Sequence, residues 1–361
     1  MIIPDIEIII VLLVLLSLFI MGLKRKKGRV GTINTVWVCL TIDKNMSVAL
    51  KGIACVFVLM GHYGTWLLNT DVNCGIVTTM VTHTTANIAL AWFMFFSGYG
   101  LSLKLCDKDK IGKVLIKRLE KLYFPLLYVC LCAVLIYLVL PYSNLGVAIS
   151  QWYEEIHHIN EDNILSNLRN TFGLNDWYVV CIIYFVSLFY LAVFIAKETG
   201  YNLSILLGVL LLCYIVVAYF VYGPPQAHYY RYPWAFMFGH LVATHNRNSR
   251  MANIVLLIVF FLTWGLLDKF CILSYVIAIF LLICAGMFNI KYEFNGKILL
   301  YLGGLSYFFY LSHERVGWPL IMLSGIEYKS MIMWIFMTIL CSIAFDKVYF
   351  LLKKNINNKC I

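Results

Sequence analysis

Long uninterrupted runs of apolar residues dominate this sequence and decide which solvent the chain can fold in. Eleven runs begin near residues 6, 48, 86, 122, 177, 201, 231, 251, 270, 298 and 330. One helix needs about 20 such residues to cross a bilayer, so a chain of 361 residues accommodates roughly ten to twelve crossings. Charged residues make up only 13%, about half of the roughly 25% usual in soluble domains, which excludes a water-soluble globule. We predict an all-α, polytopic membrane bundle of about eleven transmembrane helices.

The seventh run differs from the others in length and composition. It covers only about residues 232–244 and contains Pro233, Gly239 and His240. Irregular or short segments occur at membrane depth only where protein or a water-filled cavity surrounds them. We therefore expect this run to be tilted, broken or partly re-entrant.

The charges around the first run predict the orientation of the chain. Asp5 and Glu7 precede the run, and five basic residues follow it at 24–29, which is the reverse of a signal peptide. Because basic loops stay in the cytoplasm, the N-terminus lies outside and, after eleven crossings, the C-terminus lies in the cytoplasm. This topology puts twenty-two of the 28 Lys and Arg residues on the cytoplasmic side and five outside. Membrane orientation thus explains the net charge of +10, and we predict no nucleic-acid partner.

The longest predicted outer loop, 141–176, carries the adjacent histidines His157 and His158 among several carboxylates. One interpretation is a solvated surface loop, and the other is a lid or an acceptor-recognition surface. Neighbouring residues on a helix diverge and no third ligand is evident, so the pair does not indicate a metal site. The twelve cysteines lie almost all within apolar runs, where a thiol behaves as a small hydrophobe. We predict no metal centre.

Lys51 and His62 are two titratable residues within one apolar run. Their separation of eleven residues is close to three helical turns, which places both on one face about 16 Å apart along the axis. Lys51 then lies at the cytoplasmic mouth and His62 near the middle of the membrane. Lys51 alone is typical of a snorkelling interfacial anchor, and His62 alone is equally compatible with a hydrogen bond to a neighbouring helix.

A second basic group, Lys117, Arg118 and Lys121, follows the next span. Lys117 and Lys121 are four residues apart on one helical face, with Arg118 on the flank, which suits the polyphosphate of a cytoplasmic ligand. The span before this group ends in Ser97, Gly98 and Gly100, which also favour close helix packing.

The tenth run contains a polar stripe. Ser306, Tyr310 and His313 follow an i, i+4, i+7 pattern, so they face one direction in an otherwise apolar helix. The stripe indicates a protein interior or a water-filled cavity, although packing alone also explains it. Glu314 and Arg315 are compatible with a position at the membrane interface.

These segments, in this order, resemble the acyltransferase 3 family of integral membrane acyltransferases over residues 45–353. The resemblance rests on five motifs, of which each is weak alone. They are the basic residue and histidine Lys51–His62, the Phe-Phe-Ser-Gly-Tyr sequence 95–99, the basic sequence 117–121, Asp176-Trp177-Tyr178, and the sequence 306–313. The family usually has Arg where this chain has Lys51, Lys117 or Lys121, and lysine lacks the bidentate fork of arginine.

The resemblance implies ten core helices plus one added N-terminal helix. Residues 1–44 would form that helix and a basic linker, 45–353 the acyltransferase domain and 354–361 a cytoplasmic tail. The family moves an acyl group, most often acetyl from cytoplasmic acetyl-CoA, onto hydroxyls of extracytoplasmic glycans or related envelope molecules. The donor and acceptor would be substrates, and no tightly bound cofactor is implied.

The resemblance also implies roles for individual residues. His62 would be the leading catalytic residue, with His313 and Glu314 beside it. The predicted donor-binding residues are Lys51, Ser97, Lys117, Arg118 and Lys121, and the predicted acceptor-binding residues are Trp177, Tyr178 and Tyr310. Two other classes stay open: an exporter or flippase of the same family that transfers no acyl group, and a sensor or scaffold.

Overall fold

The computed structural model describes residues 3–26, 42–68, 74–105, 107–139, 176–223, 228–244, 256, 258–259, 272–317 and 330–359. Almost all of these residues are helical, and the only sheet among them is a two-stranded ribbon. The prediction of an all-α fold is therefore confirmed. The predicted outer loop with its paired histidines and the run near residue 251 lie outside the described residues, apart from isolated positions.

Eight of the eleven predicted starts lie within four residues of a helix start, and those at 86 and 122 lie 10 and 11 residues inside the described helices. The described helices are α1 (Ile3–Gly22), α3 (Lys44–Leu68), α4 (Ile76–Ser102), α5 (Ile111–Val139), α8 (Trp177–Thr199), α9 (Leu203–Tyr222), α10 (Pro233–Thr244), α12 (Ile272–Lys291), α13 (Lys297–Gly304), α14 (Ser306–Ser312) and α16 (Met331–Lys359). Six of them, α1, α3, α8, α9, α12 and α16, are long and apolar enough to cross a membrane. The chain is therefore a multi-pass membrane protein, and the number of crossings stays a prediction.

Two of the predicted spans have an irregular form. The run near residue 298 is not one continuous helix: it divides at Leu305 into α13 and α14, and a π-helical turn, His313–Gly317, follows. The seventh run forms α10, which at 12 residues is about 18 Å long and too short to cross about 30 Å of hydrocarbon. The side chains of α10 are almost all buried, as expected for a short segment surrounded by protein.

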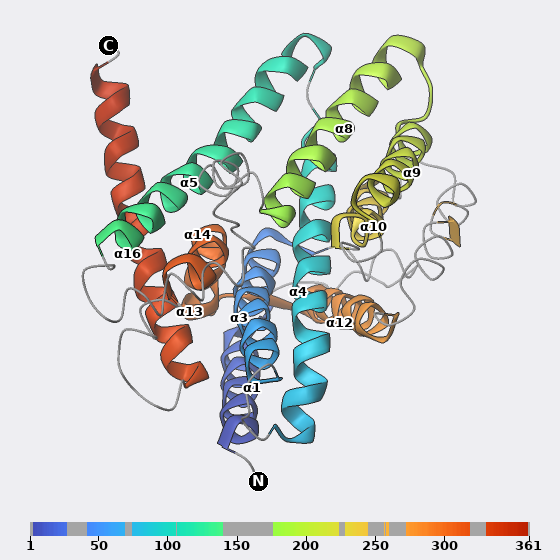
Figure 1. Cartoon of the computed structure of the whole chain (residues 1–361). Coiled ribbons are helices and arrows are strands. Elements are labelled where there is room, and N and C mark those ends of the chain that lie inside the picture. The colour runs from blue at the N-terminus through green and yellow to red at the C-terminus, as the bar shows by residue number, and fades with distance from the viewer. Residues whose placement is uncertain are drawn as a thin grey trace.

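Glycines let the central helices approach closely. A methyl group on Gly98 of α4 would overlap the carbonyl of Phe236 in α10, and one on Gly239 of α10 would overlap the carbonyl of Phe95 in α4. On the other side of the core, Gly61 of α3 packs against Ala86 of α4. Figure 1 shows α3 and α4 in the middle of the bundle. Small residues at these crossings therefore bring backbones together, as in other membrane bundles.

The start of α1 is tied to two other helices by its carboxylates. Asp5 accepts hydrogen bonds from the backbone N–H of Thr78 in α4 at 3.0 Å and from its hydroxyl at 2.6 Å. Glu7 accepts one from the Ser330 hydroxyl at 2.6 Å and one from the N–H of Met331 in α16 at 2.9 Å. The first N–H groups of a helix have no hydrogen-bond partner within that helix. The two carboxylates of α1 therefore accept from such N–H groups of α4 and α16.

The opposite end of α1 pairs with the end of α12. Strand β1 (Leu23–Arg25) is antiparallel to β2 (Tyr292–Phe294), and the Lys26 ammonium donates to the carbonyl of Asn289 at 2.6 Å. The two termini of the chain lie at opposite ends of the molecule (Figure 1). The arrangement thus gathers the basic residues after α1 and α12 at one end of the bundle.

The contact at Gly98 predicts that alanine substitutions at two glycines of α4 differ strongly in their effect on stability. Gly98→Ala should lower stability by about 1–3 kcal/mol, because the methyl group meets a backbone carbonyl that cannot rotate away. Gly100→Ala is the matched control, since an added Cβ there has no neighbour within 4 Å. Thermal unfolding in detergent measures both, and equal midpoints for the two variants would contradict the packing.

Candidate active site

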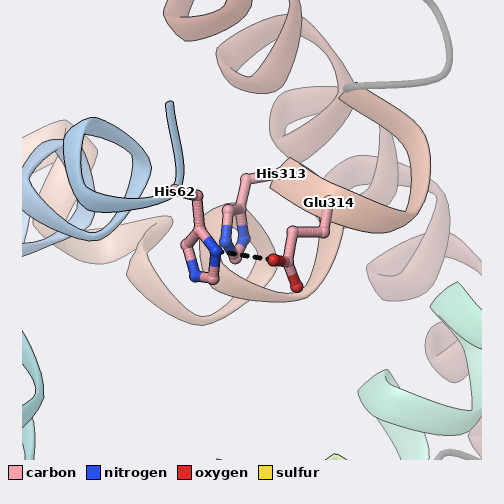
Figure 2. Close-up of side chains that lie close together, drawn as sticks. All are labelled: His62, His313 and Glu314. Atoms are coloured by element: carbon pink, nitrogen blue, oxygen red, sulfur yellow. Dashed lines mark ion pairs between the residues drawn. The ribbon is translucent and has the colours of Figure 1, made fainter. Parts of the chain in front are cut away.

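His62 of α3 and Glu314 of the π-helical turn form a close pair. Nδ1 of His62 lies 2.7 Å from Oε1 of Glu314, and both side chains are partly exposed, at 39% and 28% (Figure 2). A carboxylate accepts hydrogen bonds, so this contact assigns a proton to Nδ1, and in the neutral imidazole Nε2 then has a free lone pair. An imidazole held in this tautomer by a carboxylate can accept a proton from a reacting hydroxyl.

His313 presents a second nitrogen next to this pair. Its ring centroid lies 4.9 Å from that of His62, and its Nδ1 hydrogen-bonds to the carbonyl of Tyr310. Since a carbonyl only accepts, Nδ1 carries the proton. Nε2 of His313 is buried and has no hydrogen-bond partner in the part of the chain that the structure describes. Such an unsatisfied acceptor fits a hydroxyl or water that enters the site.

The same three side chains could also hold a metal ion. His62, His313 and Glu314 each offer one ligand atom, and these atoms lie within 4.8 Å of one another. Two histidines and one carboxylate are a known donor set for zinc. Sequence spacing did not reveal this set because the residues come from two distant segments. The absence of a metal centre stays a prediction.

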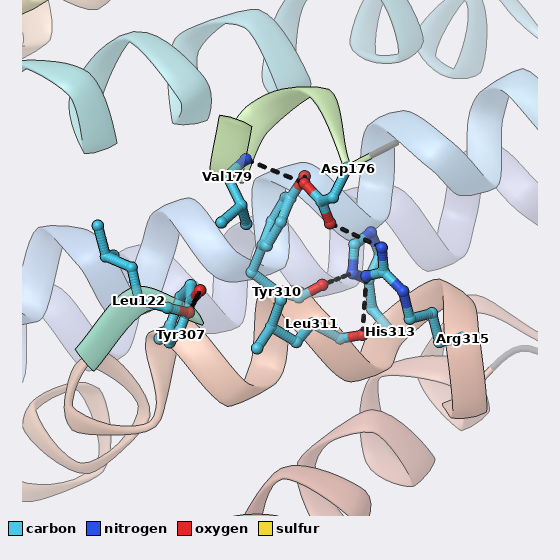
Figure 3. Close-up of polar contacts among 8 residues, drawn as sticks. All are labelled: Leu122, Asp176, Val179, Tyr307, Tyr310, Leu311, His313 and Arg315. Carbon is cyan, nitrogen blue, oxygen red and sulfur yellow. Dashed lines mark hydrogen bonds and ion pairs between the residues drawn. The ribbon is translucent and has the colours of Figure 1, made fainter. Parts of the chain in front are cut away.

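A buried ion pair holds the π-helical turn against the start of α8. Nη2 of Arg315 lies 2.8 Å from Oδ2 of Asp176, and the two side chains are only 13% and 4% exposed (Figure 3). Asp176 also caps α8 by accepting from the N–H of Val179 at 3.0 Å, and it accepts from the Tyr310 hydroxyl at 3.3 Å. Asp176 therefore positions both Arg315 and Tyr310 beside His313.

Sequence reasoning did not assign roles to Asp176 and Arg315. The sequence analysis includes Asp176 only in the motif Asp176-Trp177-Tyr178, although an aspartate directly before an apolar helix is a strong N-cap signal. Arg315 was counted among outer basic residues at the interface, and the structure instead buries it against Asp176. No local pattern pairs residues 139 positions apart, so only the tertiary structure brings them together.

A cluster of aromatic side chains packs at the start of α8, beside Asp176. The rings of Tyr178 and Tyr310 lie 4.6 Å apart between centroids, and Trp177 lies 4.9 Å from His228 and 5.9 Å from Tyr232. Burial, followed by the positive charge of Arg231, lowers the pKa of His228 to about 4, so this ring is neutral at physiological pH. The three predicted acceptor-binding residues thus belong to one aromatic wall.

A cavity of about 550 Å³ gathers most of the predicted donor-binding residues. Lys51, Ser97, Arg118 and Lys121 all line it, together with Lys44, Lys104 and residues of α3, α4, α5 and α8. The ammonium of Lys51 lies 5.5 Å from the ring centroid of Phe96, within the range of a cation–π contact. The Ser97 hydroxyl donates to the carbonyl of Phe93 at 2.8 Å. Lys44 and Lys104 are lining cations that the sequence motifs do not single out.

Lys117 does not line this cavity, although it was predicted to act with Arg118 and Lys121. It lines a separate groove between α5 and α16. The spacing of four between Lys117 and Lys121 does place them on one face, but Arg118 and Lys121, three apart, share the face that points to the cavity. Lys121 lies at the edge of both surfaces.

The ion pair predicts a strong effect of removing one partner. Arg315→Leu should lower stability by about 3–5 kcal/mol, because it leaves the Asp176 carboxylate buried without its cation. Asp176→Asn with Arg315→Leu should recover part of this loss. Chemical unfolding measures both variants, with Lys347→Ala at an exposed position as the control. A double variant no more stable than the single one would contradict the coupling.

Comparison with known proteins gives one family. A family model for the acyltransferase domain, acyltransferase 3, matches residues 48–345, which is most of the chain and includes the His62–Glu314 pair and most residues that line the basic cavity. No curated protein and no solved structure matches. The match confirms the resemblance found in the sequence motifs, and the chain belongs to the acyltransferase 3 family.

Proposed function

We propose that this membrane acyltransferase moves an acyl group, most often acetyl, from cytoplasmic acyl-CoA to a hydroxyl of an extracytoplasmic glycan or related envelope molecule. The observation that carries the proposal is the arrangement along α3. Lys51 lies at the basic cavity, and His62, about 16 Å further along the axis, contacts Glu314. One helix thus connects a site suited to phosphates with a site suited to proton transfer.

The basic cavity supports the donor end of the proposal. Five of its lining residues are cationic: Lys44, Lys51, Lys104, Arg118 and Lys121. Ammonium and guanidinium groups bind the phosphate oxygens of a nucleotide through charge-assisted hydrogen bonds. Among the lining residues that the structure describes, Arg118 is the one guanidinium, and its planar fork can form a bidentate contact. With the nucleotide held here, the acyl end of the donor would extend toward His62.

The chemistry at the other end follows from the tautomer of His62. Nε2 of His62 would take the proton of the acceptor hydroxyl while the oxygen of that hydroxyl attacks the thioester carbonyl. Collapse of the tetrahedral intermediate would break the C–S bond, and the CoA thiolate would receive that proton from the imidazolium. Glu314 would stabilise the imidazolium through Nδ1. A route in which His62 first carries the acyl group stays open.

His313 and the aromatic wall support binding of the acceptor. The bare Nε2 of His313 can accept a hydrogen bond from a second hydroxyl of the acceptor and so orient the molecule. Trp177 and Tyr310 are partly exposed aromatic side chains with polar edges, which suit a ring that carries both C–H and O–H groups, and the buried Tyr178 supports Tyr310. In the proposed orientation this wall faces outward and the basic cavity faces the cytoplasm.

Removing the proposed base tests the function. His62→Ala should abolish acyl transfer in proteoliposomes supplied with acetyl-CoA and a glycan acceptor, and Glu314→Gln should lower kcat by about 10²–10⁴-fold. Glu293→Gln, which changes a carboxylate of the distant strand β2, is the matched control and should keep the parent rate. Activity must also survive a chelator, since loss would indicate a metal at His62. Transfer at the parent rate by His62→Ala would refute the assignment.

The donor site has its own test. Lys51→Ala and Arg118→Ala should each raise the KM for acetyl-CoA about ten-fold, because each removes a charged hydrogen-bond donor from the cavity. Lys117→Ala should leave this KM unchanged, since Lys117 lines the other groove. Initial rates at varied acetyl-CoA measure the three variants. Equal changes in KM for Lys117 and Arg118 variants would show that the cavity is not the donor site.

A further inference from the structure

A second concave surface lies between α5 and α16, and the proposed reaction does not use it. We call it the α5–α16 groove. It encloses about 810 Å³ and is lined by Lys117, Glu120, Lys121, Phe124, Leu127, Tyr128, Leu131, Tyr349, Leu352 and Lys353. Figure 1 shows α16 passing the C-terminal part of α5 and the two helices diverging from there. The ring of Tyr128 contacts Phe345 and Tyr349 of α16 at this crossing.

The groove is amphipathic along its length. Three lysines, Lys117, Lys121 and Lys353, lie toward the N-terminal end of α5 and the C-terminal end of α16, with Glu120 as the single carboxylate. The remaining lining residues are apolar or aromatic. Phe124, Leu131 and Leu352 are 52%, 45% and 47% exposed, so a large part of this surface contacts the surroundings of the bundle. One end of the α5–α16 groove thus has a net positive charge, and the rest of its surface is apolar.

The dimensions of the groove match one leaflet of a bilayer. Lys121 and Leu131 are ten residues apart on α5, which corresponds to about 15 Å along the helix axis. Half of the hydrocarbon core of a bilayer is also about 15 Å thick. With the lysines at the level of the head groups, the apolar part of the groove reaches to about the middle of the membrane.

We propose that the α5–α16 groove binds one anionic glycerophospholipid of the cytoplasmic leaflet. The phosphate would contact Lys117 and Lys353, and the acyl chains would lie along Phe124, Leu131 and Leu352. Glu120 would accept a hydrogen bond from a hydroxyl of the head group. The choice of leaflet rests on the proposed orientation of the chain, but the binding does not depend on acyl transfer.

Charge and shape together favour a lipid over a soluble phosphate. A free phosphate would contact the lysines alone, whereas one phospholipid contacts the lysines through its phosphate and the apolar lining through its acyl chains. A zwitterionic lipid would fill the apolar part, but its own cation would oppose the excess of lysine. An anionic lipid is the occupant that complements the entire groove.

Lipid binding to the delipidated full-length chain in neutral detergent tests the proposal. Phosphatidylglycerol should bind with a stoichiometry of one at the groove, seen by native mass spectrometry, and should raise the unfolding temperature more than phosphatidylcholine. Lys117→Ala and Lys353→Ala should each weaken phosphatidylglycerol binding about five-fold, which corresponds to about 1 kcal/mol per lysine. Lys117→Arg should retain it. Lys121 is left unchanged because it also lines the donor cavity.

Lys113→Ala is the matched control, because Lys113 is exposed one helical turn before Lys117 and does not line the groove. This variant should bind phosphatidylglycerol like the parent. Three results would overturn the proposal: equal binding of phosphatidylcholine, an equal loss in Lys113→Ala, or displacement of the lipid by inorganic phosphate or CoA. None of these measurements requires acyl transfer, so they stand apart from the test of the enzymatic function.

Discussion

An ionised side chain cannot stay unpaired in an apolar interior, and the pairing of Asp176 with Arg315 meets this constraint at the centre of the molecule. Asp176 begins α8, while Arg315 lies in the π-helical turn that also carries His313 and Glu314. The pair therefore fixes the turn relative to α8. His62 meets Glu314 because this turn is held in place. Short π-helical segments are frequent at functional sites, and this one brings three consecutive polar residues into the core.

The two ends of α3 make the proposed reaction physically coherent. The donor is a large, highly charged molecule that suits the cationic cavity, while proton transfer needs an imidazole held in a fixed position, as Glu314 holds His62. One rigid helix carries both functions and keeps them at a constant separation. Glycines on α3 allow its close packing against α4, since Gly61 packs against Ala86 and Gly64 against Thr82.

The first helix is part of the same packing and not a detached anchor. Asp5 and Glu7 supply acceptors to N–H groups in the first turns of α4 and α16, which have no partner within their own helices. At the other end, the β1–β2 ribbon connects α1 to α12. Carboxylates that argue against a signal peptide in the sequence thus have a structural reason to be there.

The sequence by itself determined the solvent, the helical class and the family. Apolar runs of membrane length exclude a soluble fold, and the ordered motifs from Lys51 to His313 indicate the acyltransferase 3 family. Helical spacing also correctly placed Lys51 and His62 on one helix, because an α-helix has a constant rise and turn.

Only the tertiary structure decided which distant residues meet. Periodicity describes one helix at a time, so it could not show that Glu314 pairs with His62, that Arg315 pairs with Asp176, or that Lys117 faces α16. It also predicted one continuous helix near residue 298, where the structure has a break and a π-helical turn. These features depend on contacts between segments more than a hundred residues apart, and local hydrogen bonding and hydropathy contain no information about such contacts.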